Sequence, residues 1–139
     1  MSETWVDGFI GDWALDPATC DFQQGDPPLS GRMRIERQGD DLRFDIELVD
    51  ATGDADRRSF LTRPDGRAEV FDGGDLADAL TTRAPVRDVL ETAASYRGIE
   101  RMIVQRSLSV DLSSMTVVQT VILPDRSELV NTSVYRRIH

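Results

Sequence analysis

The sequence predicts an all-β protein, a single antiparallel up-and-down β-barrel of about ten strands over residues 1–139. Apolar and polar residues alternate through most of the chain after Gly31, as in strands with one buried face. Turn-forming residues recur at short intervals between these stretches, without a sizeable helical segment. Short hairpin connections favour a meander, and closing the meander into a barrel would remove both exposed sheet edges.

The segment before Gly31 is the least regular part of the sequence. We expect residues 1–8 to form a loose lead-in and residues 9–13 to form a short first strand. Residues 16–28 are rich in Pro, Gly, Asp and Gln, which predicts an ordered loop or lid. The pair Asp16-Pro17 is typical of the start of a single helical turn.

The middle of the chain contains the clearest strand signals. Leu42, Phe44, Ile46 and Leu48 alternate with charged residues. Further strands are expected at residues 31–37, 57–63, 67–71 and 76–83, separated by turn-forming residues.

Residues 86–96 are ambiguous, because their apolar positions also fit one face of a helix. Pro85 and Gly98 bracket the segment, and strands are expected on both sides of it. We therefore predict a strand here.

The last three predicted strands, within residues 99–137, have two mixed faces. Arg106 lies among apolar residues of the first strand and Gln119 among those of the second, while Asn131, Tyr135 and Arg137 share one face of the third. Such faces are too polar for a solid core, so one of them is expected to line a pocket. A shift of one residue would exchange the faces, so the sequence leaves open which one points inward.

The composition argues against several classes of function. The 139-residue chain has a formal net charge of −9, and all 16 basic residues are arginine. An acidic domain repels phosphate backbones, so nucleic acid is not an expected partner. The chain has no lysine and one cysteine, and its one histidine, His139, is terminal. Schiff-base, histidine-dependent and structural zinc chemistry are therefore not expected, and we predict no cofactor, metal site or catalytic residue.

The same features predict where the protein resides. No stretch approaches the ~20 apolar residues of a membrane helix, and the N-terminal residues lack the pattern of a signal peptide. The single Cys20 fits a reducing compartment. We expect a cytoplasmic protein with no membrane partner, and the exclusive use of arginine suggests a GC-rich bacterial genome.

The motif Gly11-Asp12-Trp13, the long loop after it, the meander of strands and the final Arg136-Arg137 together resemble the lipocalin and fatty-acid-binding (calycin) superfamily. Its small bacterial lipocalin-like members are the most similar. The resemblance implies that Gly11 and Trp13 are structural, that Trp13 plugs the closed end of the barrel, and that Arg136 or Arg137 packs across its ring. It also implies a central cavity that holds a small lipophilic molecule.

The mixed faces and the resemblance together predict non-enzymatic binding of a small hydrophobic or amphipathic ligand. Arg106, Tyr135 and Arg137 are suited to grip a carboxylate by charge-assisted hydrogen bonds, and we expect Gln119 and Asn131 to line the cavity. The competing interpretation pairs Arg106 with an internal acid, leaves Arg137 on the surface and turns the two amides to solvent.

Two other functions remain open from the sequence. A cofactor-free isomerase, cyclase or hydrolase would use Tyr135, Arg106 and a buried carboxylate with a perturbed pKa, such as Asp45 or Glu47. An interaction module would instead pack a homodimer through outward-facing apolar residues, for which Val49, Ile103 and Val118 are candidates.

Overall fold

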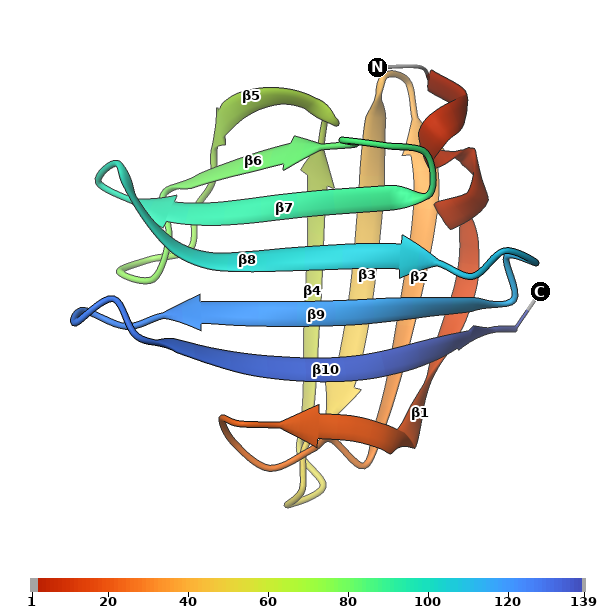
Figure 1. The fold of residues 1–139 in the computed structure, drawn as a ribbon, viewed down its shortest axis with the longest axis horizontal. Helices are drawn as coiled ribbons and strands as arrows, with labels where there is room; N and C mark the ends of the chain where they lie inside the picture. The colour runs from red at the N-terminus through yellow and green to blue at the C-terminus, as the bar shows by residue number, and fades with distance from the viewer. Residues whose placement is uncertain (1–2, 139) are drawn as a thin grey trace.

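The computed structural model describes residues 3–138, which form one short 3₁₀-helix and ten β-strands (Figure 1). The elements are η1 (Glu3–Phe9), β1 (Gly11–Phe22), β2 (Ser30–Gln38), β3 (Asp41–Val49), β4 (Ala55–Thr62), β5 (Asp65–Val70), β6 (Ala79–Arg83), β7 (Val89–Tyr96), β8 (Ile99–Leu108), β9 (Ser114–Ile122) and β10 (Glu128–Arg137).

All ten strands belong to one antiparallel sheet in the order β4-β3-β2-β1-β10-β9-β8-β7-β6-β5. Neighbours in the sheet are neighbours in the chain except where β1 pairs with β10. The two ends of this order, β4 and β5, are not joined by a backbone ladder, so the barrel is nearly rather than fully closed. The predicted all-β, antiparallel up-and-down barrel of about ten strands is confirmed.

Strand β1 connects the two walls of the barrel. Figure 1 shows β7–β10 crossing β2–β4 at a steep angle, with β1 curving from one set into the other. The N-terminal half of β1 pairs with β2, and its register with β10 shifts between Asp16 and Asp21. Such an irregularity bends a strand and strengthens its twist, which lets one strand serve both walls.

The expectation of a loop or helical turn after Asp16 is therefore wrong for residues 16–22. The local signals are real, because Asp16 Oδ1 accepts a hydrogen bond from the Ala18 amide at 3.2 Å and Thr19 Oγ1 donates to the Asp16 carbonyl at 2.6 Å. These bonds stabilise the irregularity inside β1, where Pro17 has no amide to offer a ladder.

The N-terminal segment also differs from the expectation of a loose lead-in. Residues 3–8 belong to η1, whose Val6 and Phe9 side chains are buried in the core. Residues 1–2 and His139 lie outside the described residues. The ambiguous segment is a strand from Val89 onward, as predicted.

The main core lies at the end of the barrel covered by η1. Its buried residues come from η1, from β1–β3 and from the far wall: Val6, Phe9, Trp13, Leu15, Met33, Ile35, Leu42, Phe44, Ala84, Leu90, Met115 and Tyr135. A smaller cluster of Ala77, Leu80 and Ala94 lies beside β6 and β7. No helix in the described part of the chain is long and apolar enough to cross a membrane.

Candidate ligand-binding interior

The register of the last strands settles which face points inward. Arg106 lies opposite Leu90, and Tyr135 lies opposite Met115, and both partners are fully buried. Residues directly opposite each other in a ladder share a face. The predicted ligand-binding residues, Arg106, Gln119, Asn131, Tyr135 and Arg137, therefore all lie on the inner face.

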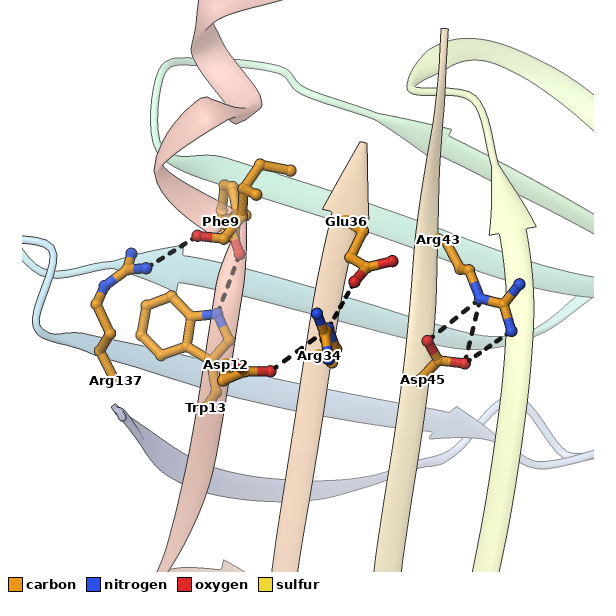
Figure 2. Close-up of polar contacts among 9 residues, drawn as sticks. Phe9, Asp12, Trp13, Arg34, Glu36, Arg43, Asp45 and Arg137 are labelled. Atoms are coloured by element: carbon orange, nitrogen blue, oxygen red, sulfur yellow. Dashed lines mark hydrogen bonds and ion pairs between the residues drawn. The ribbon is translucent and has the colours of Figure 1, made fainter. Parts of the chain in front are cut away.

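Trp13 plugs the end of the barrel next to η1. Its side chain is fully buried, and its indole Nε1 donates to the Phe9 carbonyl at 3.0 Å (Figure 2). Gly11, two residues earlier, has a φ of 141°, a conformation that residues with a side chain rarely adopt. The glycine and the tryptophan together turn the chain from η1 into β1.

Arg137, and not Arg136, packs against this tryptophan. The Arg137 guanidinium lies 4.2 Å from the centre of the Trp13 ring. It also donates to the carbonyls of Leu112 and Ile10, each at 2.9 Å, and to that of Gly8. Each of its three nitrogens thus donates to a backbone carbonyl at the closed end, and the expectation that Arg137 also grips a ligand carboxylate stays a prediction.

Arg136 lies on the outer face, where it is exposed and forms an ion pair with Asp16 at 3.4 Å. Successive strand residues point to opposite faces, so Arg137 points inward and packs on Trp13 while Arg136 points outward.

The interior changes from packed to accessible along the barrel axis. Around Trp13 most inward side chains are buried, whereas further along β8 and β9 they are only half-buried. The half-buried inward residues of these two strands are Leu108 next to the plugged end and, further along, Met102, Val104, Val117, Gln119 and Val121. A barrel filled solidly by its own side chains would bury these residues as completely as those around Trp13.

Arg106 lies at the boundary between the two halves. It is 4 % exposed, and its guanidinium lies 4.6 Å from the centre of the Phe44 ring on the opposite wall. The atoms Nε and Nη1 are buried and have no hydrogen-bond partner, and no ion pair among the described residues includes this arginine. The expected alternative, an internal acid paired with Arg106, is therefore not what the structure shows.

Burial lowers the pKa of Arg106 from its ordinary value to about 10, and the neighbouring Tyr135 partly opposes this shift. The guanidinium consequently stays protonated at neutral pH. A buried charge without a carboxylate partner is costly, because desolvation is not offset by a pairing energy. The cation–π contact with Phe44 offsets only part of that cost.

Tyr135 lies close to this cation. Its side chain is 5 % exposed, and burial raises the pKa of its phenol while Arg106 lowers it. The raised pKa keeps the phenol neutral at physiological pH, so its hydroxyl can donate a hydrogen bond. Arg106 and Tyr135 thus place two neighbouring donor groups on the inner face, and the buried Nε and Nη1 of Arg106 have no acceptor among the described residues.

The two predicted amides occupy different places. Gln119 points inward, and its Nε2 lies 2.9 Å from the Met102 sulfur, which is a weak acceptor. Asn131 instead holds the segment after β1: its Oδ1 accepts from the amides of Gln23 and Gln24, and its Nδ2 donates to the Gln24 carbonyl. Asn131 therefore shapes the rim, and Gln119 lines the accessible interior.

The carboxylates considered for an enzyme lie outside the barrel. Asp45 pairs with Arg43 at 3.2 Å (Figure 2), and Glu47 pairs with Arg57 at 2.6 Å. Hydrogen bonds from Ser59 and then from Arg43 lower the pKa of Asp45, as expected of an ordinary surface carboxylate. Asp45, Glu47 and Arg57 line an open hollow of about 530 Å³ on the outer surface. Neither acid can supply a general acid or base next to Arg106 and Tyr135.

Three buried threonines form a hydrogen-bonded chain that the sequence pattern does not predict. Thr62 Oγ1 donates to Thr82 Oγ1 at 2.7 Å, and Thr82 Oγ1 lies 3.0 Å from Thr92 Oγ1. The chain joins β4 to β6 and β7, across the place where the backbone ladder is missing. Threonine is common in strands on both the buried and the exposed face. The sequence around each threonine therefore gives no sign that the three hydroxyls meet.

These features define a nearly closed, ten-stranded antiparallel barrel with a plugged end, an accessible half and, between them, a cation that has no acidic partner among the described residues. No protein-family model matches the sequence, and no curated protein matches it significantly. Chains of solved structures do match the fold, 42 in all. One is a crystal structure of zebrafish ileal bile acid-binding protein complexed with cholic acid, which superposes with a TM-score of 0.56 at 11% sequence identity over 95% of this chain and 100% of that chain. At this identity the likeness concerns the fold.

Proposed function

We propose that this protein binds a small amphipathic molecule whose anionic group, a carboxylate, lies against Arg106 and Tyr135. The observation that carries the proposal is the buried Arg106 guanidinium, which among residues 3–138 has no carboxylate partner and has two buried nitrogens without an acceptor. A ligand carboxylate would supply both the missing charge and the missing acceptors.

The apolar part of the ligand would occupy the accessible half of the interior. The inward residues there are mainly Met102, Val104, Val117 and Val121, all half-buried. Apolar walls with a few polar groups are typical of small-molecule sites. The solved neighbour with this fold was complexed with cholic acid, itself a carboxylic acid with a large apolar body, and this supports the same class of ligand.

The test compares dodecanoate with dodecanol by isothermal titration calorimetry, because the two share a tail and differ in the head group. The wild-type protein is expected to bind dodecanoate roughly tenfold to hundredfold more tightly, as charge-assisted hydrogen bonds do. The variant Arg106→Met should lose this preference. The matched control Arg136→Met removes an exposed arginine from the outer face and should keep it.

A stability measurement separates a binding role from a structural one. Urea unfolding of Arg106→Met should show a free energy of unfolding equal to or above that of the wild type, because the substitution removes an unpaired buried charge. Equal affinity for dodecanol and dodecanoate, or a preference that survives in Arg106→Met, would refute the carboxylate site.

A further inference from the structure

We infer a second polar subsite in the interior, formed by Thr92 at the end of the threonine chain together with Gln119, which binds an uncharged oxygen on the apolar body of the ligand. This inference rests on the proposed function, because it describes the same ligand further from its carboxylate. It predicts that the ligand is an oxygenated acid, such as a keto or hydroxy acid, rather than a plain alkyl acid.

The first argument is a count of protons. Three hydroxyl groups carry three protons, and the chain contains two hydrogen bonds, so one proton is left without an acceptor. Thr62 donates to Thr82, which leaves two arrangements for the second bond. Either Thr82 donates to Thr92, or Thr92 donates to Thr82.

Burial selects between these arrangements. Thr82 is fully buried, so a free proton on Thr82 would carry the full penalty of an unsatisfied buried donor. Thr92 is 7 % exposed and is the least buried of the three. The favoured arrangement therefore runs from Thr62 through Thr82 to Thr92, and the free proton is on the Thr92 hydroxyl.

The second argument is the position of Thr92 relative to Arg106. Arg106 lies opposite Leu90, so Thr92 is its diagonal neighbour on the same inner face, about 7–8 Å away between backbone positions. This level of the barrel lies beyond Arg106 as seen from Trp13. A molecule held by its carboxylate at Arg106 would extend its body past Thr92.

The third argument is that Gln119 lies at the same level. The ladders place Gln119 opposite Val104, and Val104 opposite Thr92. Its amide donates to the sulfur of Met102, an acceptor much weaker than a carbonyl oxygen. A ligand oxygen at this level could accept a hydrogen bond from the Thr92 hydroxyl on β7. It could also accept one from the Gln119 amide on β9, and it would be a stronger acceptor for that amide than the Met102 sulfur.

The experiment measures binding of dodecanoate and of its keto derivatives, with the carbonyl placed at successive carbons of the chain, by calorimetry. The wild-type protein should prefer one keto position over dodecanoate by about threefold to tenfold, as one added neutral hydrogen bond does. Thr92→Val should lose the preference for the keto acid and keep its affinity for dodecanoate. Thr92→Ser should retain the keto preference and the dodecanoate affinity. Thr81→Val is the matched control, because Thr81 points outward from the neighbouring strand β6.

The outcomes distinguish the two proposals. Arg106-dependent binding of dodecanoate with no preferred keto position would overturn the second subsite and leave the carboxylate site intact. A keto preference that persists in Thr92→Val would overturn the role of Thr92. Absence of binding for all of these acids would overturn both proposals. Circular dichroism on each variant checks that the fold is retained.

Discussion

Arg106 and Arg137 show how one residue type serves two purposes on the same inner face. Arg137 donates to three backbone carbonyls and stacks on Trp13, so its charge is fully engaged at the plugged end. Arg106 is more deeply buried, yet its Nε and Nη1 have no acceptor. The contacts of Arg137 stabilise the fold, whereas a buried charge without an acceptor, as at Arg106, does not. The proposed binding site is therefore centred on Arg106.

The role of Arg137 leads to a stability prediction. Arg137→Met should lower the free energy of unfolding by about 2–4 kcal/mol, because three backbone carbonyls lose a charged donor and Trp13 loses its cation–π partner. Urea unfolding followed by Trp fluorescence would measure the change. Arg136→Met is the control and should shift the free energy by less than about 1 kcal/mol, since its ion pair is exposed. Equal losses in both variants would contradict the assignment.

Among the elements, the turns between the last strands depend on acidic residues. In the β8–β9 turn Asp111 accepts from the hydroxyls of Ser109 and Ser113 and from the Ser113 amide. Hydrogen bonds from Ser113 and then Ser109 lower the pKa of Asp111 to about 2. Asp125 repeats the arrangement with Ser127 in the β9–β10 turn, where the pKa of Asp125 is likewise lowered.

The lowered pKa of Asp111 predicts a pH dependence. Its folded-state pKa lies below the usual value of about 4, so its stabilising effect is complete above that value and is lost as the pH falls toward 2. Wild type should be more stable than Asp111→Asn at pH 6, and the difference should shrink between about pH 4 and pH 2. Urea unfolding at a series of pH values tests this, and a difference that stays constant would contradict it.

Strand β1 shows why element boundaries were harder to predict than element types. Asp16-Pro17 favours a turn in isolation, and the local hydrogen bonds of a turn do form. They lie inside a long strand because β10 resumes pairing with β1 at Asp21. The hydrogen-bond ladder between β1 and β10 is stronger than the local preference of Asp16-Pro17 for a turn, so the strand continues past these residues.

At the scale of the whole molecule, the barrel has a rigid end and a more open side. The plugged end joins η1, β1 and β10 through Trp13 and Arg137. On the opposite side the sheet ends at β4 and β5, most of whose residues are exposed. Between β4 and β6 the hydrogen bond from Thr62 to Thr82 substitutes for a backbone ladder.

This difference predicts the pattern of hydrogen exchange. Amides of β4 and β5 should exchange faster than those of β9, because β9 is paired on both sides and the two end strands are paired on one. Addition of dodecanoate should slow exchange in β8 and β9, which line the accessible half of the interior. Mass spectrometry of peptide fragments would measure both effects. Equal protection of β5 and β9 in the free protein would contradict the proposed open side.

The sequence by itself determined the class of fold, the approximate number of strands and, within each of the last strands, which residues share a face. Alternation with a period of two is a local property, so it can be read without knowing which strands pair. The plug at Trp13 was likewise anticipated, through the resemblance of Gly11-Asp12-Trp13 to a known motif.

Only the tertiary structure decided what each of these side chains contacts. The inward face of the last strands, the choice of Arg137 over Arg136, the outward position of Asp45 and the threonine chain all depend on register and on contacts across the barrel. A one-residue shift reverses every face of a strand, and the sequence of the strand alone does not set that shift. Whether the charge of Arg106 is paired depends on which residues lie opposite it in space, and these come from strands distant in the chain.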